Sequence, residues 1–149
     1  MRGRTKILLV LGTVAFVAIS YGLARWLTTE SRERQAILEV LEAQAKGDPK
    51  GMLEKLAPSC STDTRCRAIV ESNARRLRRA GEPKILNLQS KTSYALGDST
   101  GVTRVAWTVV NNGLPVVQCV VVHRGGSVFA GRFVSLLRVS APIGNESTC

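Results

Sequence analysis

GVTRVAWTVVNNGLPVVQCVVVHR, residues 101–124, is the stretch of this 149-residue chain that decides its fold class. Two runs rich in β-branched residues, which favour strands, flank the dipeptide Asn112-Gly113. A type I′ hairpin turn needs positive φ at both central residues, so Asn-Gly between two such runs is a strong hairpin signal. The stretch therefore predicts an antiparallel hairpin in which Trp107 lies opposite Gln118.

Further runs of the same composition extend this hairpin into a sheet. They are KILNLQSKTSYAL (84–96) and SVFAGRFVSLLRV (127–139). Gly125-Gly126 predicts a second hairpin turn, which would place Cys119 near Arg132. The run 114–124 is apolar on both faces. In a strand with one face in solvent, apolar and polar residues would alternate. We expect one face to meet helices, and the other to be curled inward or covered by a partner.

The residues before Lys84 show the helical period instead. Apolar residues recur three or four positions apart in SRERQAILEVLEAQAKGD (31–48), DPKGMLEKLAPSC (48–60) and STDTRCRAIVESNARRLRRAGEP (61–83). The residues expected to begin or end these helices are Ser31, Gly47, Asp48, Pro49, Pro58, Thr62 or Asp63, Gly81 and Pro83. Helices followed by strands predict an α+β domain over residues 36–140, with about three helices on a curved antiparallel sheet of about four strands. Residues 141–149 form a C-terminal tail.

The N-terminal stretch has the pattern of a membrane helix. Ile7–Ala24 holds no charged residue, and residues 7–27 as a helix would span about 30 Å, the thickness of a bilayer core. Three basic residues precede it within 1–6, which the positive-inside rule keeps in the cytoplasm. Residues 28–35 are expected to be a juxtamembrane linker or the start of the next helix. The domain that follows would then be extracytoplasmic, behind a single pass through the lipid bilayer.

A cleaved signal peptide is the alternative to a retained anchor. Small residues at 18–20 and 22–24 have the spacing that a signal peptidase reads, but the apolar stretch is longer than the usual signal core of about 7–15 residues. We expect an anchor in the cell membrane, with secretion after cleavage as the alternative. Either outcome exports the domain.

Four cysteines agree with export, because an even count in an exported chain permits two disulfides. Cys60 and Cys66 are separated by a short polar loop and are the expected bridge. Cys119 and Cys149 would form the second bridge if the tail folds back. The chain has no CxxC, and His123 is not spaced with a cysteine as a zinc site requires, so we expect neither metal nor cofactor.

Two stretches resemble the nuclear transport factor 2-like superfamily, whose fold is a cone-shaped α+β domain. AILEVLEAQAKGDPKGMLEKLAPSC (36–60) resembles its opening, in which a helix ends at Gly-Asp and a short helix follows. VVQCVVVHRGGSVFAGRFVSLL (116–137) resembles its last two long strands. The chain departs from that pattern in having a shortened sheet. Many bacterial members stand behind one N-terminal membrane helix, in secretion and conjugation assemblies or in actinobacterial envelopes.

The resemblance implies a non-catalytic role in binding an envelope protein or assembling a secretion system. It carries over no catalytic residue. Enzymes of the superfamily place an acid–base pair inside the cone, for which the candidates are Asp48, Asp63, Asp98, Tyr94 and His123. The first two are better explained as helix caps, Asp98 as a turn residue and His123 as an exposed surface residue. A cone that binds a lipid or small apolar molecule is the second alternative, and an enzyme is the third.

The run ARRLRR is the sharpest functional signal. Arg75, Arg78 and Arg79 are expected to share one helix face, with Arg76 beside it. Cations at a helix C-terminus offset the helix dipole, which gives the run a purely structural explanation. The alternative is an anionic partner, in keeping with a net charge of +10. Aromatic residues are too few for stacking on single-stranded nucleic acid, so no nucleic-acid partner is expected.

Overall fold

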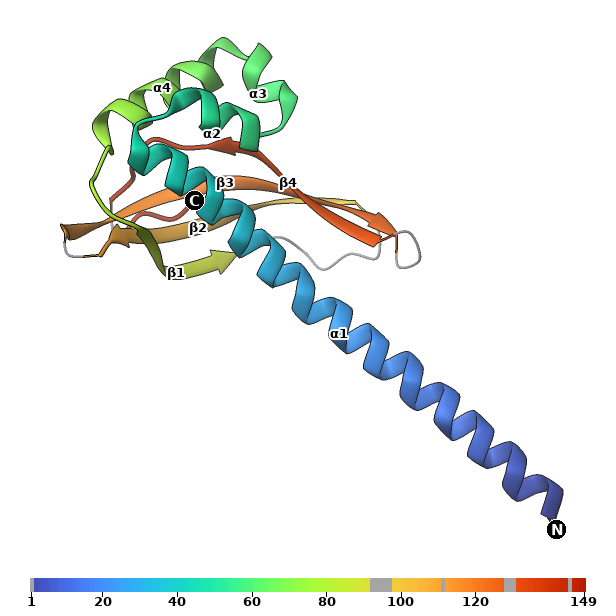
Figure 1. Ribbon diagram of the computed structural model, residues 1–149. Coiled ribbons are helices and arrows are strands. Elements are labelled where there is room, and N and C mark those ends of the chain that lie inside the picture. Colours follow the sequence, from blue (N-terminus) through green and yellow to red (C-terminus); the bar gives the residue numbers. More distant parts are fainter. Residues whose placement is uncertain (1, 92–97, 111, 128–130, 145) are drawn as a thin grey trace. The chain divides into compact units, whose positions relative to one another are not determined.

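The computed structural model describes residues 2–91, 98–110, 112–127, 131–144 and 146–149, without the side chains of 2–9, 23–29, 112, 127, 131 and 132. The chain forms two compact units, Met1–Arg32 and Glu33–Cys149. Helix α1 (Arg2–Lys46) supplies the first unit and continues into the second, so residues 28–35 are helical. The second unit is an α+β domain with a four-stranded antiparallel sheet, as predicted (Figure 1).

Residues 33–46 of α1 pack against the sheet through one apolar face. Ile37, Val40, Leu41 and Ala45 are at most 3% exposed, at the i, i+3, i+4 spacing of an amphipathic helix. The helix ends at Lys46. Gly47 follows with a backbone φ of 76°, which an L-residue other than glycine adopts only with strain. This ending was predicted from the sequence and is confirmed.

The short helices that follow begin at the residues the sequence marked as caps, with one exception. The Asp48 side chain accepts from the Gly51 N–H at 3.0 Å and caps α2 (Pro49–Lys55). The Asp63 side chain accepts from the Arg65 N–H at 2.9 Å and caps α4 (Thr64–Arg76). Pro58, expected only to stop a helix, instead begins the single turn of α3 (Pro58–Thr62), because a proline suits the first helical position.

The sheet has the strand order β1-β2-β3-β4, and each neighbouring pair is antiparallel. The strands are β1 (Pro83–Ser90), β2 (Ser99–Val109), β3 (Asn112–Ser127) and β4 (Gly131–Val139). Residues 92–97, which include the end of the first predicted strand, lie outside the described residues.

The first hairpin turns two positions earlier than predicted. Val109 pairs with Asn112, and Trp107 lies opposite Val116 rather than Gln118. Gly113 still supplies a positive φ of 81°, but it follows the turn, and a register shift between Trp107 and Val109 recovers half of the difference in pairing. Because side chains alternate between faces with a period of two, a shift of two positions leaves each one on its predicted face.

The second hairpin does not turn at Gly125-Gly126, so that prediction is wrong. Strand β3 runs through both glycines, Gly126 pairs with Arg132, and Cys119 is far from Arg132 in the register. A Cβ on Gly125 would come within 2.5 Å of the Phe133 ring. The missing side chain thus serves a close approach between strands rather than a turn.

The core lies between the helices and one face of the sheet, as expected. In Figure 1, α2, α3 and α4 lie on the same side of the sheet as residues 33–46 of α1. Every second residue over 103–109 of β2 and 116–124 of β3 points to these helices and is buried, and the apolar ones are Val105, Trp107, Val109, Val116, Val120 and Val122. Trp107 is completely buried and is the largest side chain of the core.

The opposite face is partly covered by the chain's own C-terminal residues. The Ser140 and Ile143 N–H groups donate to the Cys119 and Val117 carbonyls, both at 2.8 Å, which continues the pairing of β4 along the edge of β3. Cys149 then lies on the face itself, bonded to Cys119, and Val117 on that face is only 3% exposed. The sequence led us to expect an inward curl or a partner there, because a pairing of this tail with β3 leaves no local signal.

Candidate functional site

A buried ion pair lies inside the domain, where α1 meets the sheet. Arg124 of β3 donates through Nε to Glu33 Oε2 at 2.9 Å and through Nη2 to the same oxygen. The other carboxylate oxygen accepts from the Thr103 hydroxyl at 2.5 Å. Arg124 Nη2 and the Thr103 hydroxyl also each contact the Ser90 hydroxyl at 3.1 Å. The side chains of Arg124 and Glu33 are 4% and 0% exposed.

This pair is best explained as a structural element. A buried charge is tolerated only when a counter-ion and hydrogen bonds replace its water. Sequence analysis did not single out either residue. One signal was available for Arg124, which alternates with the buried Val120 and Val122 and therefore has to point toward the helices.

A second polar network crosses the middle of the core. Gln118 Oε1 accepts from Trp107 Nε1 at 2.8 Å and from Gln44 Nε2 at 2.9 Å. Gln118 Nε2 donates to the Ser140 carbonyl at 2.9 Å, and Asn73 Nδ2 donates to that same carbonyl at 2.9 Å. The network ties α1, α4, two strands and the tail together, because each buried polar group finds its partner on another element.

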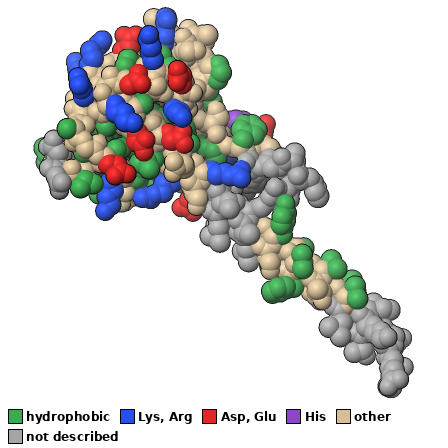
Figure 2. Space-filling model, viewed as in Figure 1, with side chains coloured by type: hydrophobic (Ala, Val, Ile, Leu, Met, Phe, Trp, Pro, Cys, Tyr) green, Lys and Arg blue, Asp and Glu red, His purple; other side chains and the backbone are tan. Residues whose placement is uncertain are grey.

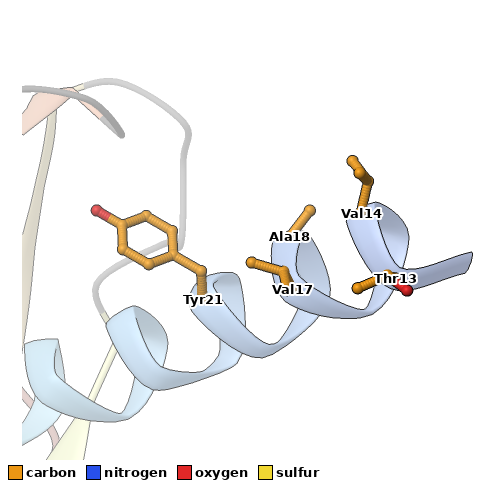
Figure 3. A pocket seen from close by; sticks show the side chains of 5 residues that line it. All are labelled: Thr13, Val14, Val17, Ala18 and Tyr21. Atoms are coloured by element: carbon orange, nitrogen blue, oxygen red, sulfur yellow. The ribbon is translucent and has the colours of Figure 1, made fainter. Parts of the chain in front are cut away.

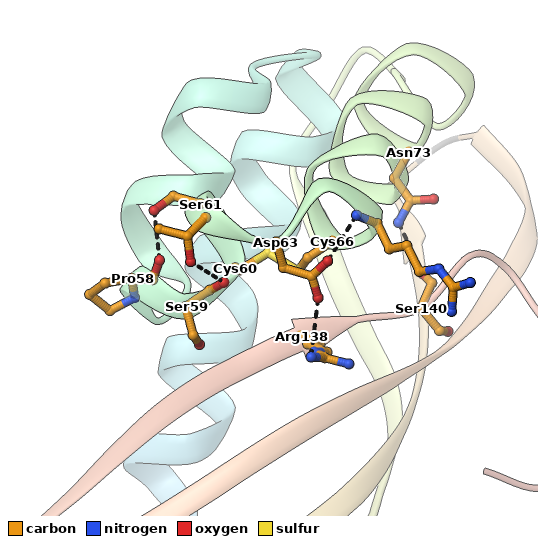
Figure 4. The surroundings of a disulfide bond; sticks show 11 residues. Pro58, Ser59, Cys60, Ser61, Asp63, Cys66, Asn73, Arg138 and Ser140 are labelled. Carbon is orange, nitrogen blue, oxygen red and sulfur yellow. Dashed lines mark hydrogen bonds and ion pairs between the residues drawn. A yellow bond between two sulfur atoms is a disulfide. The ribbon is translucent and has the colours of Figure 1, made fainter.

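Both predicted disulfides are confirmed. Cys60–Cys66 joins α3 to α4 and is buried, and Figure 4 shows it beside the ion pair between Asp63 and Arg138 at 3.1 Å. Cys119–Cys149 fastens the tail to β3. Arg104 Nε also donates to the carbonyl of Ser147 in the tail, at 3.1 Å.

A small cavity lies where this tail meets β1 and β2. Its volume is about 80 Å³. It is lined by Gln89, Lys91, Val102, Arg104, Thr148 and Cys149. Pockets for drug-sized ligands have volumes of roughly 300–1,000 Å³. This cavity is therefore too small to hold a lipid.

The arginine run does not form the single helical face that the sequence predicted. Helix α4 ends at Arg76, so Arg78 and Arg79 lie beyond it. The helix stops here because Leu77 turns into the core and the Arg79 N–H donates to the Ala45 carbonyl of α1 at 3.0 Å. Arg75 and Arg76 stand in the last turn, where cations offset the dipole. Binding of an anionic partner by this run stays a prediction.

Arg79 has a structural position between the helices and the first hairpin. Its Nη1 donates to the Leu114 carbonyl at 2.8 Å, and its guanidinium lies 5.8 Å from the centre of the Trp107 ring. Arg75 approaches Glu71 at 4.0 Å, and both side chains are largely exposed. The sequence could not predict the contact with Leu114, since the two residues come together only when the sheet docks on the helices.

The four candidate acid–base residues that the structure describes do not meet inside the domain. Asp48 and Asp63 are helix caps, as predicted. Asp98 Oδ1 accepts from the Gly126 N–H at 3.2 Å. His123 is half-buried on the sheet face opposite the helices, with Nδ1 3.2 Å from the Thr100 hydroxyl. Tyr94 lies outside the described residues.

The side chains that the structure describes between Val10 and Tyr21 give the first unit an exposed apolar helix surface. Figure 3 shows a shallow concavity on α1 lined by Thr13, Val14, Val17, Ala18 and Tyr21. Among the described residues, no helix is both long enough and apolar enough to cross a membrane. The predicted membrane segment 7–27 includes residues 7–9 and 23–27, whose side chains are outside the description.

Comparison with known proteins gives no relative. No protein-family model, no curated protein and no solved structure matches this chain. The resemblance to the nuclear transport factor 2-like superfamily therefore stays a prediction that rests on the two stretches quoted above.

Proposed function

We propose that this chain is a single-pass membrane protein whose exported domain binds a protein partner in an envelope or secretion assembly, without catalysis. One observation carries the choice of binding mode: the described side chains between the helices and the sheet are closed off from solvent. Trp107, Met52 and Leu136 are at most 2% exposed between the helices and the sheet. A binding cone for a lipid needs open volume there, so recognition at the surface is favoured over recognition in a cavity.

The location is supported by the cysteines and by the sequence of the first unit. All four cysteines are paired, and disulfides persist in oxidising compartments outside the cytoplasm. The uncharged residues 7–24 follow three basic residues, which favours a cytoplasmic N-terminus and an exported C-terminus. We propose that this stretch is retained as an anchor, because it is longer than the usual apolar core of a cleaved signal peptide.

The enzyme alternative has weaker support. The charged pair inside the domain is Glu33 with Arg124, and both are closed off from solvent by the side chains around them. A general acid or base has to come within hydrogen-bond reach of its substrate. We therefore assign this pair to stability, and His123 to the surface of the sheet.

Two measurements test the location. Fusion of an export-dependent phosphatase after Cys149 should give active enzyme in intact cells, and the protein should leave the membrane with detergent but not with alkaline carbonate. Val14→Arg, which puts a charge in the middle of the apolar stretch, should release it or block its insertion, because a charge there costs roughly 2.5–3.5 kcal/mol. Phosphatase activity confined to the cytosol would refute the proposal.

The binding role is tested separately by isolating the full-length protein at its native level. We expect one or more envelope proteins to co-purify in fixed stoichiometry after detergent extraction. Recovery of the protein alone, from membranes in which it is correctly inserted, would contradict the assembly role while leaving the location intact.

A further inference from the structure

We propose that one end of the domain binds an acidic protein segment that carries an apolar side chain. This inference rests on the proposed binding function and names its surface. The arginine–leucine surface, as we call it, combines the end of α4 with the turn between β2 and β3. Its exposed residues are Arg76, Arg78, Val110 and Leu114.

Leu114 is the centre of this surface. Its side chain is 80% exposed, the highest value among the exposed large apolar side chains of the described chain. Its backbone is nevertheless held firmly, because Arg79 donates to its carbonyl and is itself held by the Ala45 carbonyl and by the face of the Trp107 ring. An apolar side chain on a fixed backbone loses little entropy on binding, which suits it to act as an anchor.

One neighbour enlarges the apolar area. Val110, at the turn between β2 and β3, is 52% exposed, and its N–H donates to the Glu82 carbonyl at 3.2 Å. Pro115 is exposed too, but as the next residue of β3 it points to the opposite face of the sheet. Single exposed apolar residues are common on protein surfaces and need no explanation. Val110 and Leu114 differ from these in standing at one hairpin end that is bonded on both sides, which suits an interaction site.

Basic side chains border this apolar area. Helix α1 ends at Lys46 and helix α4 at Arg76, and the bond from Arg79 to Ala45 brings the two ends together. Figure 2 shows Lys and Arg side chains over the end of α4, with apolar side chains at the end of the sheet below them. Arginine binds carboxylates through two parallel hydrogen bonds, so exposed guanidinium groups around an apolar centre fit an acidic partner.

The chemistry of the surface favours a protein segment over lipid headgroups. It combines exposed guanidinium groups with an apolar side chain on a fixed backbone. An acidic protein segment supplies both complements in one chain, carboxylates for the arginines and an apolar side chain for Leu114.

The test is a selection of random fifteen-residue peptides on the full-length protein in nanodiscs of uncharged lipid. We expect the selected peptides to be rich in Asp and Glu around one or two apolar residues. Leu114→Ser should weaken their binding about tenfold or more, as for an anchor at the centre of an interface. Arg76→Gln with Arg78→Gln should weaken it and reduce its dependence on salt.

Matched variants of the same chain serve as controls. Leu86→Ser changes an exposed apolar residue on β1, and Arg65→Gln with Arg67→Gln changes two exposed arginines at the other end of α4. These should leave peptide binding within about twofold, since surface changes away from an interface have small effects. Glu82→Gln should tighten binding, because it removes an exposed carboxylate beside Val110.

Three results would overturn the inference. They are the recovery of no binding peptide, peptides whose affinity is unchanged by Leu114→Ser, and binding to vesicles of anionic lipid that depends on Leu114 and Arg76 in place of peptide binding. The proposed function can survive such a result. If the Leu114→Ser protein still co-purifies with its native partner in full stoichiometry, only the assignment of the surface is wrong.

Discussion

Replacing Glu33 with leucine tests whether the buried ion pair is a structural element. The change leaves the Arg124 guanidinium, 4% exposed, without its counter-ion. Removing one partner of a buried pair costs about 3–5 kcal/mol in free energy of unfolding, mostly because a charge stays buried without compensation. The double variant Glu33→Leu with Arg124→Met removes both charges. It should recover most of that loss, because an apolar pair of similar volume is often as stable as the ion pair.

An exposed ion pair on the same helix supplies the control. Glu39 lies 3.0 Å from Lys55, and the two side chains are 40% and 47% exposed. Glu39→Leu should therefore cost about 1 kcal/mol or less, as exposed pairs do. The contrast between the two glutamates separates the effect of burial from the effect of losing a carboxylate in α1.

The assay is urea unfolding of the full-length protein in detergent micelles, followed by the fluorescence of Trp107 in a Trp26→Phe background. Trp107 is completely buried, so its emission should shift on unfolding. A loss below about 1 kcal/mol for Glu33→Leu would refute the reasoning, because it would mean that the Arg124 charge reaches water. A double variant no more stable than the single one would contradict the claim that the cost comes from the unpaired charge.

Three further changes have expected outcomes in the same unfolding assay. Loss of the Cys119–Cys149 bridge by double substitution with serine should cost about 3.6 kcal/mol from a sequence separation of 30, against about 2.2 kcal/mol for the separation of 6 in the helical disulfide. A larger effect at the shorter loop would contradict this entropic account. Gly47→Ala should cost about 1–2 kcal/mol, because an L residue is strained at a φ of 76°. No measurable loss would mean that the backbone relaxes there. Trp107→Phe should cost about 1–3 kcal/mol by leaving a cavity and removing a donor to Gln118, measured by circular dichroism because the fluorescent probe is lost. A variant as stable as the parent would show that the core repacks.

The order of elements and most helix boundaries follow from local rules in the sequence. Asp48 and Asp63 cap helices because a side-chain oxygen three or two residues from a free N–H bonds it without help from the rest of the fold. Gly47 ends α1 for a reason equally local to the backbone. The period change at Lys84 separates helices from strands in the same way, since each period reflects which side chains share a face.

The pairing of distant residues is what only the tertiary structure decides. Neither the Glu33–Arg124 pair nor the contact between Arg79 and Leu114 has a local signature, because each joins elements that meet only when the sheet docks on the helices. The hairpin turns fell two or more positions from the expected dipeptides for a related reason. A glycine permits either a turn with positive φ or a close approach between two strands. The packing of the whole strands decides which of the two a given glycine serves.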